Sequence, residues 1–243
     1  MEEKVALITG AGKRVGACIA RTLHEEGMKV VIHYGRSENE AKKLADELNM
    51  KRPNSAEILQ ADLNNLDDIN LLAECTIKIE GRLDALINNA SAFYPTKIGS
   101  ITEDQWNELF NTNAKAPLFL AQAVAPYLKK TNGAIINMVD IHADRPLKDH
   151  PVYCMAKAAL VAMTKSLARD LAPEVCVNAV APGMILWPDE AMDEKTKSYI
   201  LNRIPMGKPG SPEYIAETIA FLLKQDYITG QVVTIDGGRS LNV

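Results

Sequence analysis

The chain has 243 residues, 47% of them hydrophobic and 24% charged, with a formal net charge of −4 at pH 7. This length suits one domain with one sizeable core, and the composition is typical of soluble globular proteins. The small negative charge argues against a nucleic-acid partner, because such a surface needs a concentrated basic face. No apolar run reaches the roughly 20 residues of a membrane span. The first residues lack the basic and apolar regions of a secretory signal, so we expect a cytoplasmic protein that binds no membrane.

Cysteine and histidine usage predicts reduced thiols and no metal site. The chain contains no C-x-x-C pair, and no histidine lies at metal-ligand spacing from a cysteine. The residues concerned are Cys18, Cys75, Cys154, Cys176, His24, His33, His142 and His150.

Short apolar runs alternate with helical patterns along the whole chain. We expect strands at 5–10, 30–34, 56–61, 83–88, 134–139, 175–180 and 231–236, and helices at 16–27, 38–48, 67–80, 102–130, 153–171 and 211–223. The strands lack strict polar/apolar alternation, which is typical of a parallel sheet buried on both faces. The pattern predicts an α/β fold: a single doubly wound, Rossmann-like domain over residues 1–243, with a seven-stranded parallel sheet flanked by helices. A polar, proline-flanked segment at about 185–209 is expected to be a substrate lid.

A glycine-rich segment, Thr9 to Gly16, joins the first strand to the first helix. Ligands of such sheets bind beyond the carboxyl ends of the strands. Glycines there allow close backbone approach, and a helix N-terminus offers N–H groups to a pyrophosphate. The segment therefore predicts a dinucleotide site, although a glycine-rich turn without a ligand would look the same.

The residues after the second expected strand favour NADPH over NADH. An NAD enzyme usually places an acid about 20 residues after the glycine loop, to bind the ribose 2′-hydroxyl. This chain instead has Gly35, Arg36 and Ser37, which suit a 2′-phosphate, and Lys13 and Arg14 add positive charge. The alternative is that Arg36 points only to solvent.

Tyr153, Lys157 and Asp140 form the candidate catalytic group. Tyr153 and Lys157 lie four residues apart, so a helix places both on one face. Asp140 follows the apolar run 134–139. An acid at a strand end and a Tyr/Lys pair at a helix start could converge on one reacting atom; an ordinary surface pair is the alternative.

Five motifs occur in the order found in short-chain dehydrogenase/reductases, and the chain resembles that family from its first strand to its last. They are the Thr9–Gly16 loop, Asn88-Asn89-Ala90, Tyr153-x-x-x-Lys157, Pro182-Gly183 and Asp236-Gly237-Gly238. The resemblance implies that Tyr153 donates a proton, and that Lys157 binds the nicotinamide ribose and lowers the pKa of Tyr153. It also implies that Asn113 supports the lysine through water. The residues implied to bind the cofactor are Gly10, Lys13, Arg14, Val15, Gly16, Tyr34, Arg36, Ser37, Asp62, Leu63, Asn89, Ala90, Ser91, Tyr153, Lys157, Pro182 and Gly183.

Two departures from the general family pattern resemble pteridine reductases. Arg14 replaces the glycine usually found two residues before Gly16, and Asp140 replaces the usual catalytic serine. The resemblance implies an NADPH-dependent homotetramer that reduces dihydropterins to tetrahydro forms. Dihydrobiopterin and dihydromonapterin are the candidate substrates, with the folate substrate dihydrofolate as a further one.

The same resemblance assigns residues to the substrate. Phe93 would stack on the pterin, Ser91 would hydrogen-bond to it, and Arg14 would bridge it to the cofactor phosphate. Met184, Leu186 and Trp187 follow Pro182-Gly183 and are expected to line the pocket with Asp140 and Tyr153; core packing is the alternative for these three and for Phe93.

The chemistry favours this substrate class. Reduction of a C=N bond needs a proton on the ring nitrogen, which a coupled Asp140–Tyr153 pair could deliver. A carboxylate would repel the oxyanion that forms when a ketone is reduced. Two alternatives remain: a short-chain carbonyl reductase of a ketone such as a 3-oxoacyl thioester, and a cofactor-binding regulatory protein without activity.

Overall fold

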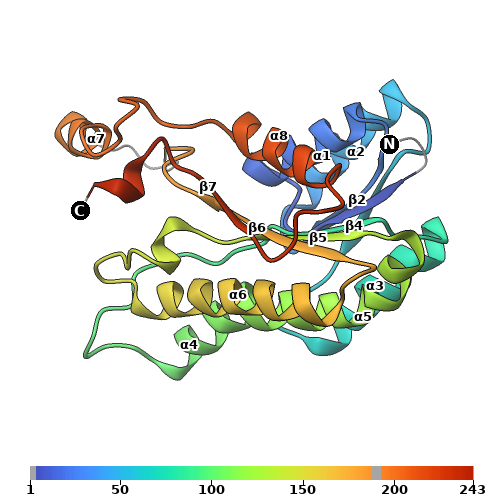
Figure 1. Ribbon diagram of the computed structural model, residues 1–243, viewed down its shortest axis with the longest axis horizontal. Coiled ribbons are helices and arrows are strands. Elements are labelled where there is room, and N and C mark those ends of the chain that lie inside the picture. Colours follow the sequence, from blue (N-terminus) through green and yellow to red (C-terminus); the bar gives the residue numbers. More distant parts are fainter. Residues whose placement is uncertain (1–3, 188–192, 243) are drawn as a thin grey trace.

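The computed structural model describes residues 4–187 and 193–242, in which seven parallel strands form one sheet. Their order across the sheet is β3-β2-β1-β4-β5-β6-β7 (Figure 1). The strands are β1 Val5–Ile8, β2 Lys29–Tyr34, β3 Ala56–Gln60, β4 Ala85–Asn88, β5 Ala134–Met138, β6 Cys176–Pro182 and β7 Val232–Ile235. The predicted α/β fold with a seven-stranded parallel sheet is confirmed.

The central strands are apolar because helices cover both faces of the sheet. All four residues of β1 are buried, and Leu7 pairs with Val31 on one side and Leu86 on the other. Figure 1 shows α1 (Arg14–Glu25), α2 (Glu38–Lys51) and α8 (Pro212–Leu222) on one face of the sheet. The opposite face carries α3 (Leu66–Glu80), α4 (Glu103–Phe110), α5 (Ala116–Thr131) and α6 (Pro151–Asp170).

Each face has its own hydrophobic core. On the first, Ile19 and Leu23 of α1 belong to one cluster with Ile215 and Ile219 of α8. The second cluster joins residues of α3 and α5, including Leu72 and Leu120, to the other face of the sheet. Within residues 4–187 and 193–242, no helix is long and apolar enough to cross a membrane.

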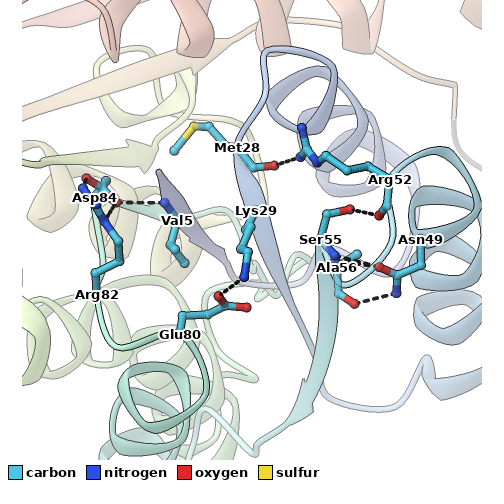
Figure 2. Close-up of polar contacts among 10 residues, drawn as sticks. All are labelled: Val5, Met28, Lys29, Asn49, Arg52, Ser55, Ala56, Glu80, Arg82 and Asp84. Carbon is cyan, nitrogen blue, oxygen red and sulfur yellow. Dashed lines mark hydrogen bonds and ion pairs between the residues drawn. The ribbon is translucent and has the colours of Figure 1, made fainter. Parts of the chain in front are cut away.

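The two ends of the strands differ in what occupies them. At the amino end, polar side chains tie neighbouring elements together (Figure 2). Asp84 accepts a 2.8 Å hydrogen bond from the Val5 N–H and pairs with Arg82, while Lys29 pairs with Glu80 at 3.0 Å. At the carboxyl end the chain order reverses between β1 and β4. Such a switch point leaves a crevice for ligands.

One expected helix differs from the prediction. The sequence predicts one helix over 102–130, but in the structure α4 and α5 are separated by a π-helical turn, η1 (Asn111–Lys115). The side-chain amide of Asn113 donates a 2.9 Å hydrogen bond to the carbonyl oxygen of Leu109, four residues earlier. A side chain that enters the helical ladder in this way widens it locally. Helical periodicity does not reveal this turn, and Thr112 within it lines a cavity at the carboxyl end of the sheet.

Candidate active site

Asp140 and Tyr153 meet at the carboxyl end of β5. The Tyr153 hydroxyl donates a 2.7 Å hydrogen bond to Oδ2 of Asp140. Asp140 is also held by its backbone surroundings, because Oδ1 accepts from the His142 N–H at 2.8 Å. Tyr153 is placed by α6, which begins at Pro151. The predicted convergence of a strand end and a helix start is therefore present as a direct contact.

The pKa of Tyr153 moves in the opposite direction from the expectation. Burial raises the pKa of Tyr153 above its ordinary value, and the charge and hydrogen bond of Asp140 raise it further. Lys157 Nζ lies 5.7 Å from the centroid of the Tyr153 ring and does not reverse this effect. The net shift is upward in this structure, and the lowering of the tyrosine pKa by Lys157 stays a prediction. Tyr153 therefore carries its proton at neutral pH, as it would at its ordinary pKa.

Lys157 lies beneath the crevice, on the same face of α6 as Tyr153. It is 2% exposed, and its Nζ donates a 2.8 Å hydrogen bond to the carbonyl oxygen of Met138. Burial lowers the pKa of Lys157 to about 8, with Asp140 acting in the opposite direction. A buried ammonium with one protein acceptor retains donors for a ligand hydroxyl.

Asn113 connects the helix with the π-helical turn to the loop after β4. Its Oδ1 accepts a 2.7 Å hydrogen bond from the Ser91 hydroxyl, and its Nδ2 donates to the Ala92 carbonyl oxygen at 2.9 Å. Both side-chain groups of Asn113 are thus occupied by protein atoms, and Ser91 faces Asn113. The water-mediated support of Lys157 by Asn113 stays a prediction.

The glycine loop packs closely against the start of the loop after β4. A Cβ on Gly10, whose φ is +61°, would lie 2.9 Å from the Cα of Ala90, and one on Gly16 would clash with the Gly10 carbonyl oxygen. Asn89 fixes this approach, because its Nδ2 donates to the carbonyl oxygens of Thr9 at 2.9 Å and Gly10 at 3.1 Å. Only glycine fits at these two positions.

A cavity of about 520 Å³ lies over this loop and fits a dinucleotide cofactor. No side chain among the described residues caps α1, so the N-terminus of that helix offers its N–H groups to a phosphate. Lys13, Arg14 and the exposed Arg36 add positive charge. Of the predicted cofactor residues, the cavity is lined by Gly10, Lys13, Arg14, Val15, Gly16, Arg36, Ser37, Asp62, Leu63, Asn89, Ala90 and Ser91.

The remaining predicted cofactor residues lie elsewhere. Tyr34 is buried at the end of β2, and Lys157 is buried below the crevice. Pro182, Gly183 and Tyr153 line the neighbouring cavity instead. Sequence reasoning missed five residues that do line the cofactor cavity: His33, Ala61, Asn64, Ala92 and Thr112. His33 could have been predicted from its position at the end of a strand, three residues before Arg36.

The neighbouring cavity, of about 810 Å³, holds the candidate catalytic pair and shares Arg14 and Val15 with the cofactor cavity. We call it the substrate cavity. Of the residues predicted to bind substrate, it is lined by Arg14, Phe93, Asp140, Tyr153, Met184 and Leu186. Ser91 lines only the cofactor cavity of the two, and Trp187 contacts the site through its carbonyl oxygen, 3.4 Å from Nη2 of Arg14.

Phe93 forms an aromatic wall of the substrate cavity. Its ring stacks on His150 with centroids 4.8 Å apart and lies edge-on to Tyr153 at 4.8 Å. Although it contacts two rings, Phe93 is 55% exposed. An exposed ring with a supported back face suits stacking on a flat ligand.

The predicted lid at 185–209 is described in part, because residues 188–192 lie outside the described residues. The segment contains α7 (Glu194–Leu201), whose Ile200 lines the substrate cavity. Its ends are anchored: the Gly210 N–H donates to the Met184 carbonyl oxygen at 2.8 Å, and the Met206 N–H to that of Gly237 at 3.1 Å. Substrate-cavity residues that sequence reasoning missed are His142, Leu147, Ile185, Ile200 and Arg239.

Comparison with known proteins gives a consistent result over nearly the whole chain. A family model described as enoyl-(acyl carrier protein) reductase matches residues 10–240. Pteridine reductase 1 of Leishmania tarentolae is 37% identical over 279 aligned residues, which cover 98% of this chain and 96% of that protein. The 3-oxoacyl-[acyl-carrier-protein] reductase FabG of Staphylococcus aureus (strain N315) is 34% identical over 240 residues, covering 97% of each chain. The protein of the same name from Thermotoga maritima is 33% identical over 243 residues, covering 98% of each.

Proposed function

This chain belongs to the short-chain dehydrogenase/reductase family, and on that basis we propose that it reduces dihydropterins to their tetrahydro forms with NADPH. Oxidoreductases of this family use NAD(P)H. The candidate substrates are dihydrobiopterin, dihydromonapterin and dihydrofolate. The observation that carries the proposal is the 2.7 Å hydrogen bond between the Tyr153 hydroxyl and the Asp140 carboxylate.

The proposed reaction needs a hydride on carbon and a proton on the adjacent ring nitrogen. A bound NADPH supplies the hydride. Tyr153, which is protonated at neutral pH, donates the proton, and Asp140 holds the hydroxyl in position and helps to replace its proton from solvent. Because the acceptor is a C=N bond that is protonated on nitrogen, the reaction forms no oxyanion for the site to stabilise. A carboxylate beside the donor is then an advantage.

The other residues of the site take positioning roles in this proposal. Lys157 contributes a buried donor to the cofactor ribose, and Asn113 with its π-helical turn fixes the floor of the crevice. Arg36, Lys13 and Arg14 support the choice of NADPH, since they give the cofactor cavity the charge that a 2′-phosphate requires. Phe93 forms one wall for the flat pterin ring. Orienting that ring toward the hydride supplies a large part of the rate acceleration.

Three features of the whole molecule belong to the same proposal. We expect residues 1–243 to work as one domain, the segment 185–209 to act as a lid, and the assembly to be a homotetramer. Gel filtration with light scattering tests the last of these directly.

A second candidate function is reduction of a 3-oxoacyl thioester, which the FabG relatives favour at nearly the same identity. The fold, the glycine loop and the Tyr153/Lys157 pair suit both reactions. The Asp140 contact distinguishes them, because a carboxylate 2.7 Å from the donor opposes the negative oxygen that forms during ketone reduction.

The deciding experiment is NADPH oxidation by the purified protein, with dihydrobiopterin, dihydrofolate and acetoacetyl-CoA as parallel substrates. We expect turnover of the pterins, with the thioester at least about 100-fold slower in kcat/KM. Turnover of the thioester alone would overturn the proposal and establish the carbonyl-reductase function. Replacing NADPH by NADH in the same assay tests the cofactor assignment, and we expect it to raise the cofactor KM.

A further inference from the structure

Besides the cofactor and substrate cavities, a tail-side cavity of about 700 Å³ continues the substrate cavity beneath α7 and the C-terminal segment. The two share His142, Leu147, Ile200 and Arg239, so a ligand that fills one reaches the other. A bicyclic pterin with a short side chain does not need both volumes. The shape therefore suits a substrate with a longer tail.

The charge of this tail-side cavity is opposite in sign to the net charge of the chain. Arg145, Lys148, Arg203 and Arg239 line it, and no aspartate or glutamate is among its described lining residues. We call it the basic cavity. The chain as a whole has a formal net charge of −4, so the concentration of cations here does not follow from the overall composition.

Among the described residues, three carboxylates close in sequence to the lining of the basic cavity are bound to groups that do not form its charge, and a fourth is paired only weakly. Glu194 pairs with Lys197 at 2.7 Å, and Asp193 accepts two hydrogen bonds from Thr196. Asp236 accepts from the N–H groups of Gly238 and Ser240. Asp144 lies 3.7 Å from Nε of Arg145, but its side chain is 94% exposed, and such a pair contributes little. Most of the positive charge therefore remains available to a ligand.

An aromatic ring contacts the side chain of one arginine, and a short helix fixes the backbone of another. The guanidinium of Arg203 lies 4.8 Å from the centroid of the Tyr199 ring on α7, a cation–π contact. Arg239 begins the short helix η3 (Arg239–Leu241), which the two Asp236 hydrogen bonds stabilise. No salt bridge is found for either arginine within residues 4–187 and 193–242. A planar guanidinium without a carboxylate partner is suited to bind a carboxylate or phosphate, and that of Arg203 is already positioned by the Tyr199 ring.

We propose that the basic cavity binds an anionic group on the tail of the substrate while the reacting ring lies in the substrate cavity. The placement of the ring rests on the proposed function. The tail chemistry is a carboxylate, as in a pteroylglutamate, or a phosphate. Tyr199, Pro146 and Leu147 give the same cavity an apolar wall, which suits an aromatic linker between the ring and the acid. A substrate with an acidic tail is then bound more tightly than one with a short neutral side chain.

The test measures equilibrium binding by calorimetry in the presence of NADP⁺, so that no turnover is needed. The probes are folic acid, with a dicarboxylate tail, biopterin, with a neutral side chain, and coenzyme A, with phosphates. The variant is the double substitution Lys148→Gln and Arg203→Gln, which changes two residues that line the basic cavity and not the substrate cavity. The control is Arg169→Gln, an exposed arginine near the far end of α6.

We expect the Kd of folic acid to rise about fivefold in the double variant, from two exposed charge contacts, with the biopterin Kd unchanged. Added salt should weaken folic acid binding in the wild type and in R169Q, and less so in the double variant. If coenzyme A alone shows this pattern, the basic cavity is an anion site whose ligand is a phosphate. The proposed pterin reductase function is then wrong. Equal changes for folic acid and biopterin, or no change for any probe, would overturn the proposal.

Discussion

The backbone N–H of Gly10 donates a 3.1 Å hydrogen bond to Nδ1 of His33. The other ring nitrogen, Nε2, lies 3.1 Å from the carbonyl oxygen of Ala61. Since Nδ1 accepts, the ring is neutral and carries its proton on Nε2. The imidazole links the glycine loop to the end of β3 across the cofactor cavity, and burial lowers the pKa of His33 below its ordinary value.

Acidification should therefore weaken cofactor binding through His33. The unfolded chain binds this proton near pH 6.5, but the folded protein binds it only at lower pH, so the stability from the neutral ring is complete above pH 6.5 and is lost as pH falls toward the folded pKa. The slope for one proton is at most about 1.4 kcal/mol per pH unit. We expect the Kd of NADPH to rise between pH 6.5 and 5, as measured by fluorescence titration.

Two variants separate His33 from other groups that titrate in this range. His33→Gln should bind NADPH more weakly at pH 7.5 and show little further loss on acidification. His24→Gln is the control, because His24 is also buried with a lowered pKa but bonds to Ser55, at the other end of the sheet. If acid weakens NADPH binding equally in H33Q and the wild type, His33 does not control the loop.

Arg14 occupies a backbone conformation that favours glycine. Its φ is +54°, in the left-handed region, and the general family pattern has glycine at this position. A residue with a Cβ costs about 1 kcal/mol there. We expect Arg14→Gly to raise the free energy of unfolding by about 1 kcal/mol in urea denaturation, while both Arg14→Gly and Arg14→Ala raise the pterin and NADPH KM. R14A keeps the strain, so equal stability of the two variants would contradict this account.

The fold was predictable because burial on both faces of a parallel sheet leaves continuous apolar runs, such as the one that contains Ile135 and Ile136. The contact of Asp140 with Tyr153 was predictable for a similar reason, since a strand end and the start of the following helix meet at one edge of the sheet. The direction of the Tyr153 pKa was not. It depends on how deeply the hydroxyl is buried, which local sequence does not contain.

The missed residues share a physical cause. Ile200 and Arg239 reach the substrate cavity only because α7 and the C-terminal segment fold over it, and no periodicity in either segment records that approach. The π-helical turn at Asn113 arises from competition between a side chain and the backbone for the Leu109 carbonyl oxygen. Helical periodicity is nearly unchanged by such a turn, so the sequence pattern looks continuous.

The Asp140 carboxylate should be needed for pterin turnover. Asp140→Asn removes the charge beside Tyr153, and loss of a proton-transfer partner typically costs about 100-fold or more in rate. We expect kcat for dihydrobiopterin to fall by that factor and the pH profile of kcat/KM to change, because the carboxylate no longer faces Tyr153. Asp140→Ser is the matched variant, with a neutral hydroxyl, and should raise acetoacetyl-CoA turnover. An unchanged pH profile in D140N would remove Asp140 from the reaction.

Phe93 should affect the pterin more than the cofactor. Stacking of a flat ring on an aromatic side chain is worth about 0.5–1.5 kcal/mol, so Phe93→Ala should raise the dihydrobiopterin KM by about 2- to 10-fold with little change in the NADPH KM. Phe221→Ala is the control, since Phe221 on α8 is 53% exposed, close to the 55% of Phe93. Steady-state kinetics with each substrate varied in turn checks this. Equal changes in both KM values would mean that Phe93 only packs the loop.

Burial of the charged Lys157 side chain should lower the free energy of unfolding of the cofactor-free protein. A pKa of about 8 in place of 10.5 means that burying the charged Lys157 lowers the free energy of unfolding by roughly 3 kcal/mol at neutral pH. The hydrogen bond to the Met138 carbonyl oxygen raises it by about 1 kcal/mol. We expect Lys157→Met to be about 2 kcal/mol more stable than the wild type at pH 7 in urea unfolding, and to lose turnover.

The pH dependence of this gain has a definite sign. Between pH 8 and 10.5 the unfolded chain binds more protons than the folded one, so wild-type stability rises with pH and the advantage of K157M shrinks. Lys165→Met, on the exposed face of the same helix, is the control and should leave stability within about 0.5 kcal/mol. A K157M protein that is less stable than the wild type at pH 7 would show that the buried ammonium stabilises the fold. The prediction that Lys157 lowers the free energy of unfolding would then be wrong.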